Sequence, residues 1–172
     1  RMNGGGAIAD YMIQAMQQQP MFYGLTRDGS LDVIPRSIYG PKAMIVNESA
    51  GSGGDALPWM FHHFKLGTLV GTRTWGGEIW LSADNFLVDR GIATAAEMGV
   101  YGPEGRWLIE GHGVDPDTVV DNPPHAAFNG DDPQLEAAIK FLEEEIRRAP
   151  VPVPPAPKYP IPLSAPAATQ PR

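Results

Sequence analysis

The stretch that decides the fold is residues 43–55, which read AMIVNESAGSGGD. The apolar run Ala43–Val46 predicts a buried strand, and the glycines from Gly51 onward predict a tight turn that leads directly into a helix. Ser52 therefore falls at the helix N-terminus, where free N–H groups and the helix dipole favour negative charge. A serine nucleophile needs such a place, with an exposed hydroxyl and backbone donors beside it. The alternative is a phosphate-binding or purely structural turn, although this stretch completes neither Gly-x-x-x-x-Gly-Lys-Ser/Thr nor Gly-x-Gly-x-x-Gly.

Outward from this stretch, apolar spacing predicts an α/β layered fold. Helices are expected over residues 8–16, over residues 57–64 with Pro58 in the first turn, and from the N-cap Asp132 to Pro150. Short strands are expected over residues 43–46, 68–70, 85–88, 92–95 and 107–109. Turns at residues 89–91 and 102–105 link some of these strands.

Composition narrows the class of protein. The chain has 172 residues, no cysteine and a formal net charge of −7, which excludes disulfides, thiol catalysis and cysteine-ligated metals. The acidic balance argues against nucleic acid and anionic membranes as partners, and no apolar run approaches a membrane span. The absence of cysteine suits a cytoplasmic protein. The sequence opens mid-motif at Arg1, so we expect it to be part of a longer polypeptide.

Proline separates two regions. Nine of the 18 prolines lie in residues 150–172, which predicts an extended polyproline tail after a single domain over residues 1–149. The tail is either a linker or an arm that lies across a neighbouring subunit.

Other candidate site residues lie in loops. The glycine triplet at residues 4–6 precedes a helix, so it and the Ser52 turn could supply two oxyanion donors from different segments. Glu110 is expected at the end of a strand, either as a solvated acid or as the group that orients a catalytic histidine. Either His112 or His125 could serve Ser52 as a base. The order Ser52, Asp89, His112 would mimic an α/β-hydrolase, a fold that needs more strands than this chain supplies. His62 and His63 are expected in solvent and not on a metal.

Several segments together resemble the catalytic core of tricorn proteases, which belong with the C-terminal-processing peptidases. The resemblance covers residues 1–146 and rests on four motifs in order: RMNGGG at 1–6, NESAGSGGD at 47–55, GTRTWGG at 71–77 and EGHGVDPD at 110–117. It implies an α/β sandwich similar to Clp protease and crotonase, of which this chain carries the C-terminal half. It also implies peptide substrates, no cofactor and no metal, and a homo-oligomer.

The resemblance assigns roles position by position. Ser52 matches the nucleophile, and Glu110 matches the acid that ends the catalytic tetrad. Gly5 and Gly53 match the two backbone donors of the oxyanion hole. An extended peptide would pair with the segment at residues 75–81 by strand addition, so the substrate-binding residues implied are Gly76, Gly77, Glu78 and Ile79.

Two departures from the family pattern keep other functions open. Gly53 stands where the family usually has an acidic residue, and none of the four histidines matches the general base, which has a serine beside it and lies upstream. The remainder of the same polypeptide would then supply that Ser-His pair, and this chain alone would be inactive. The alternatives are a catalytically silent peptide-binding or assembly domain on the same fold, and a self-contained esterase that uses His112 as its base.

Overall fold

A three-stranded parallel sheet lies at the centre of the computed structural model, which describes residues 1–82 and 85–158. The strand order is β3 (Ala43–Val46), β4 (Thr68–Gly71) and β7 (Thr118–Val119), with β4 in the middle. The strands predicted over residues 43–46 and 68–70 are therefore confirmed. β7 was not predicted, because two residues carry no readable alternation.

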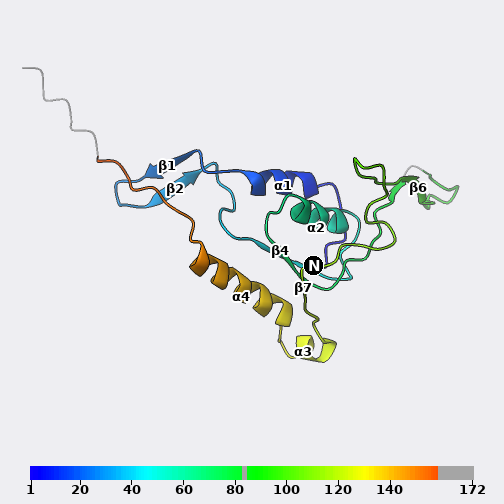
Figure 1. Cartoon of the computed structure of the whole chain (residues 1–172). Helices are drawn as coiled ribbons and strands as arrows, with labels where there is room; N and C mark the ends of the chain where they lie inside the picture. The colour runs from blue at the N-terminus through cyan, green and yellow to red at the C-terminus, as the bar shows by residue number, and fades with distance from the viewer. Residues whose placement is uncertain (83–84, 159–172) are drawn as a thin grey trace, which may run out of the picture.

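Helices cover both faces of this sheet (Figure 1). α1 (Ala9–Gln17) and α2 (Gly53–His63) lie on one face, and α4 (Pro133–Arg148) crosses the other. The apolar core is formed by α1, α2, β3, β4 and the loop before β7, and consists of Ala9, Ile13, Val46, Leu57, Phe61, Leu69 and Val114. Each large side chain buried there contributes roughly 1.5–3 kcal/mol.

The three predicted helices are present, with one correction. Asp132 caps α4 as expected, since its side chain accepts a hydrogen bond from the Leu135 N–H at 3.1 Å. α2 begins at Gly53, earlier than the apolar spacing indicated. Pro58 is therefore inside the helix, whereas the sequence predicted it in the first turn. Because proline has no N–H, the helix lacks one backbone hydrogen bond at this position.

The strand prediction is wrong between residues 85 and 109. The expected strands at 85–88, 92–95 and 107–109 are reduced to two isolated bridges, Phe86↔Ile92 and Tyr101↔Trp107. The regular strands of this region are β5 (Trp80–Ser82) and β6 (Ala95–Met98), which pair antiparallel. The segments on either side of each bridge are joined by backbone hydrogen bonds at the predicted turns. Their apolar side chains are exposed, so there is no buried face on which longer strands could pack. Glu110 consequently lies in a turn at residues 110–112 and not at the end of a strand.

Three further elements were not predicted. β1 (Phe22–Leu25) and β2 (Leu31–Ile34) form an antiparallel hairpin, and the Asp28-Gly29 pair between them was an available turn signal. α3 (Pro124–Phe128) is a short helix before α4.

The proline-rich tail carries no helix or strand over residues 151–158, which are exposed. Residues 159–172 of the expected tail lie outside the described residues. Among the described residues, no helix is both long enough and apolar enough to cross a membrane.

Candidate active site

Ser52 lies in a strained turn between β3 and α2. Its backbone angles are φ 55° and ψ −123°, a conformation that costs a residue with a side chain roughly 1–3 kcal/mol. The Ser52 N–H donates to the Gly77 carbonyl at 3.0 Å, and the Ser52 carbonyl accepts from the N–H groups of Asp55 and Ala56. The hydroxyl does not cap the helix. The sequence thus placed Ser52 correctly at the head of α2, and the turn leaves its hydroxyl free of the helix end.

The glycine loop at residues 4–6 packs directly on this turn. A Cβ added to Gly5 would lie 2.7 Å from the Ser52 Cβ, and one added to Gly53 would lie 2.1 Å from the Gly6 carbonyl oxygen. The two backbones touch, so neither position admits a side chain without movement. The Gly53 N–H donates to no acceptor in the part of the chain that the structure describes, whereas the Gly5 N–H donates to the Asn3 Oδ1 at 3.1 Å. One of the two predicted donors is therefore free, and the other is engaged.

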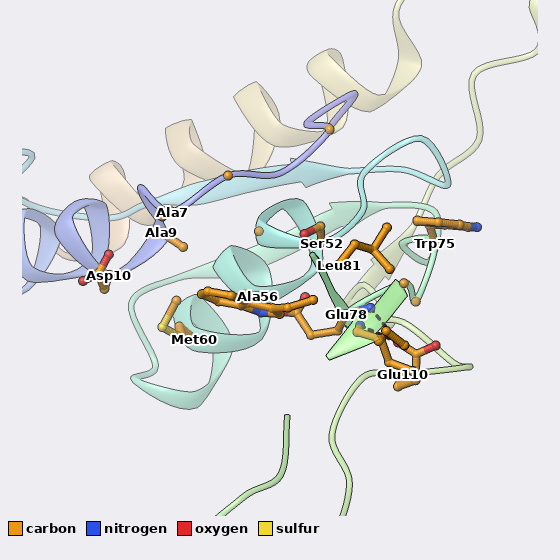
Figure 2. A pocket seen from close by; sticks show the side chains of 18 of the residues that line it. Ala7, Ala9, Asp10, Ser52, Ala56, Met60, Trp75, Glu78, Leu81 and Glu110 are labelled. Carbon is orange, nitrogen blue, oxygen red and sulfur yellow. Dashed lines mark hydrogen bonds between the residues drawn. The ribbon is translucent and has the colours of Figure 1, made fainter. Parts of the chain in front are cut away.

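A cavity of about 1250 Å³ opens beside the Ser52 turn (Figure 2). It brings together most of the residues singled out from the sequence, namely Ser52, Gly53, Gly76, Gly77, Glu78, Ile79 and Glu110. Gly5 does not line it, although its neighbours Gly4 and Gly6 do. Much of the remaining wall is apolar and comes from Met60, Trp75, Trp80 and Leu81.

Two carboxylates, Asp55 and Glu110, hold the segment 76–79 by its backbone; we call this pair the carboxylate clamp. Asp55 in α2 is fully buried and accepts the N–H groups of Gly76 at 2.9 Å and Gly77 at 3.1 Å. Glu110 accepts the N–H groups of Glu78 at 2.7 Å and Ile79 at 2.8 Å, both on Oε2. All four N–H groups are therefore taken, and the carbonyls of Gly76 and Gly77 already accept from Gly111 and Ser52. A peptide that pairs with this segment is left with the carbonyls of Glu78 and Ile79, or with the neighbouring β5.

The Glu78 side chain is buried in the wall of the same cavity. It is 4% exposed, and its Oε2 has no hydrogen-bond partner. Burial, helped by the negative charges of Asp55 and Glu110 and opposed by a hydrogen bond from the Trp80 side chain, raises the pKa of Glu78 to about 7. At neutral pH the Glu78 carboxyl is thus partly protonated.

None of the four histidines, all within the described residues, lines the cavity. His62 is exposed, as predicted, and lies 3.0 Å from an Asp117 carboxylate oxygen. His112 lies 2.8 Å from the Asp115 carboxylate, so its ring is occupied by a neighbour in its own loop. No group of acidic and histidine side chains in residues 1–82 and 85–158 is arranged to hold a metal ion.

Sequence reasoning missed two residues that shape this site. Asp55 stood in the quoted stretch, and its signal was a lone carboxylate near the start of the helix, with apolar residues following it and no cation one turn away. Trp75 is 69% exposed and its ring packs on Gly51 and Gly77, where an added Cβ would lie 2.5 and 2.3 Å from ring atoms. Its signal was the glycine pair that follows it.

A strained serine at a helix N-terminus, beside a second backbone loop and an apolar cavity, is an arrangement typical of the serine hydrolase class, and here it lies on a mixed α/β fold. Comparison with known proteins narrows this class. Residues 1–120 match the model of peptidase family S41. The chain therefore belongs to peptidase family S41, a family of serine peptidases.

Its relatives within that family are tricorn proteases. The chain is 36% identical over 155 residues to the tricorn protease of Thermoplasma volcanium, in an alignment that covers 90% of this chain and 15% of that protein. It is 31% identical over 157 residues to tricorn protease homolog 1 of Streptomyces coelicolor, in an alignment that covers 91% of this chain and 15% of that protein. A crystal structure of the tricorn protease superposes with a TM-score of 0.78 at 36% identity, over 86% of this chain and 14% of that chain. The chain thus spans about 15% of the length of the curated relatives that it matches.

Proposed function

We propose that this chain is part of a serine peptidase that hydrolyses peptides through an acyl-enzyme on Ser52. Its hydroxyl oxygen attacks the peptide carbonyl while its proton passes to a histidine supplied by another segment of the polypeptide. The peptide C–N bond then breaks, and the histidine returns the proton to the leaving amine. Water hydrolyses the acyl-enzyme by the same route in reverse. The strained Ser52 turn with the unpartnered Gly53 N–H carries this proposal.

The developing oxyanion would lie between the N–H groups of Gly53 and Gly5. The Gly53 N–H is free in the described part of the chain, while the Gly5 N–H must first leave the Asn3 side chain. Glu110 uses only its Oε2 for the segment 76–79. In our proposal its Oε1 orients a Ser-His pair supplied by another segment of the polypeptide, the role that the family resemblance implies for it.

Labelling with a fluorophosphonate tests this proposal. We expect the complete polypeptide to label at Ser52, with loss of the adduct and of peptide hydrolysis in Ser52→Ala. Ser49→Ala is the matched control, because Ser49 is an exposed serine of the same loop, and it should keep both signals. Labelling elsewhere, or hydrolysis that survives in Ser52→Ala, would refute the assignment. Labelling of the present chain by itself would move the base inside these residues and favour the esterase that uses His112.

A second candidate is a silent peptide-binding domain on the same fold. Two observations favour it: no histidine of the described residues lines the cavity, and Asn3 occupies one of the two donors. It predicts that the complete polypeptide binds peptides, by fluorescence anisotropy, without cleavage and without labelling. The cytoplasmic location and the homo-oligomer stay predictions.

A further inference from the structure

The Glu78 carboxyl is unusual because it is buried without a cation. Its side chain is 4% exposed and its Oε2 has no hydrogen-bond partner, although a buried carboxylate normally has an ion pair or several donors. It lies in the cavity wall next to the backbone that the carboxylate clamp holds (Figure 2).

The groups that face Glu78 are acidic or neutral. Asp55 comes from α2 and Glu110 from the turn at residues 110–112, while the Trp80 side chain of β5 donates a hydrogen bond. Asp10 and Tyr11 of α1 line the same cavity. In the described residues, no lysine, arginine or histidine lines this cavity or forms an ion pair with any of these three carboxyl groups.

Each carboxylate of the clamp accepts two backbone N–H groups, and such bonds are stronger when the acceptor is charged. A third negative charge at Glu78 would be repelled by both, with no counter-charge among the described residues to relieve it. The structure can lower that repulsion by letting residues 76–79 move away from Asp55 and Glu110, which would also move the Gly77 carbonyl that holds the Ser52 N–H at 3.0 Å.

We propose that Glu78 is a positioning residue: as a neutral acid it allows the carboxylate clamp to hold residues 76–79 against Ser52, and its ionisation loosens that segment. The regulation of catalysis that follows rests on the proposed peptidase function, whereas the loosening of the backbone does not. The linkage has a definite sign, since the pKa of Glu78 is about 7 when the segment is held and near its ordinary 4.5 when the segment is released. Release is therefore favoured as pH rises from 4.5 to about 7, and gains nothing further above that.

Hydrogen exchange of the complete polypeptide, read by mass spectrometry on fragments that contain residues 76–79, tests this directly. After correction for the intrinsic pH dependence of exchange, the protection of these amides should fall by up to roughly tenfold per pH unit between pH 4.5 and about 7, and then level off. Glu78→Gln, which keeps the shape and cannot ionise, should remove the slope. Glu104→Gln, at an exposed glutamate of the turn 102–105, should keep it.

Kinetics provide the second readout. The ratio of kcat/KM for the wild type to that for Glu78→Gln should fall as pH rises through the same range, because titration of the histidine base cancels in the ratio. A wild-type slope that is absent, or one that persists in Glu78→Gln, overturns the inference. Should Glu78→Gln fail to fold, the wild-type exchange profile alone decides, and a flat profile overturns it. The protein could show the expected exchange and yet neither label with a fluorophosphonate nor hydrolyse peptides. That result would refute the proposed peptidase function and support the positioning role of Glu78.

Discussion

Replacing Asp55 by alanine tests how much the carboxylate clamp contributes. Asp55 is fully buried and accepts the N–H groups of Gly76 and Gly77 at 2.9 and 3.1 Å, so its loss leaves two buried donors without an acceptor. Hydrogen bonds to a charged group contribute about 1.5–3 kcal/mol each, which gives roughly 3–6 kcal/mol for the pair. Relief of the repulsion between Asp55 and Glu78 offsets part of this, and we expect a net local loss of about 2–4 kcal/mol.

This local loss should be detected as faster exchange of nearby backbone amides while the overall fold stays intact. At about 1.4 kcal/mol per factor of ten, exchange of the amides of residues 76 and 77 should accelerate roughly 30- to 1000-fold in Asp55→Ala. Asp55→Asn keeps one carbonyl oxygen and should lie between this variant and the wild type. Asp131→Asn, at an exposed aspartate far along the chain, is the control and should change nothing. Exchange in Asp55→Ala within about threefold of the wild type would refute the clamp, because threefold is less than 1 kcal/mol.

Two further predictions concern Gly53 and the pH dependence of stability. Gly53→Ala places a Cβ 2.1 Å from the Gly6 carbonyl oxygen, which should displace the loop at residues 4–6 and destabilise the fold by about 1–3 kcal/mol, seen as a lower melting temperature. Gly4→Ala is the control, because an added Cβ there has nothing within 4 Å, and it should leave the melting temperature unchanged. Equal melting temperatures for the two variants would contradict the close approach at Gly53. Because the pKa of Glu78 is raised from 4.5 to about 7, its contribution to stability is fully present below pH 4.5 and is lost as pH rises to about 7. This amounts to roughly 2–3 kcal/mol after allowance for solvent screening. The free energy of unfolding, measured with denaturant, should fall with pH more steeply in the wild type than in Glu78→Gln between pH 4.5 and about 7, and in parallel with it outside that range.

The sequence predicted those parts of the fold in which local pattern and burial agree. β3 and β4 are apolar runs in the middle of the molecule, and α1, α2 and α4 each carry a continuous apolar face, so periodicity located all five. Between residues 85 and 109 the β-type composition is just as strong, yet Phe86 and Trp107 are 71% and 74% exposed. With no buried face to pack on, residue preference produced single bridges in place of strands.

The candidate site divides in the same way. A motif of consecutive residues located Ser52 and Gly53, because strand, turn and helix start follow each other directly in the chain. The bonds from Glu110 to the backbone of residues 78 and 79 join segments 31 or more residues apart. No spacing rule predicts that contact. The resemblance marked Glu110 as functional, but the structure shows a partner for it that sequence reasoning did not contain.

The engaged Gly5 donor bears on how the oxyanion hole would form. The Asn3 side chain accepts the Gly5 N–H at 3.1 Å, while the Asn3 backbone carbonyl separately accepts the Gly51 N–H at 2.9 Å. A neutral hydrogen bond of this kind contributes about 1 kcal/mol, and a bond to an oxyanion is roughly twice as strong. The developing negative charge can therefore replace the Asn3 side-chain oxygen as acceptor for the Gly5 N–H, while the bond from Gly51 to the Asn3 carbonyl still holds the loop.

Asn3→Ala should accordingly free the Gly5 N–H and leave the bond between the Asn3 position and Gly51 in place. We expect the rate of fluorophosphonate labelling at Ser52 to rise about fivefold, which is the factor that corresponds to 1 kcal/mol. Asn3→Asp, whose charged oxygen holds the same donor more strongly, should lower the rate. If both variants slow labelling equally, the Asn3 side chain orients the loop instead of blocking it, and Gly5 would need that bond to be positioned at all.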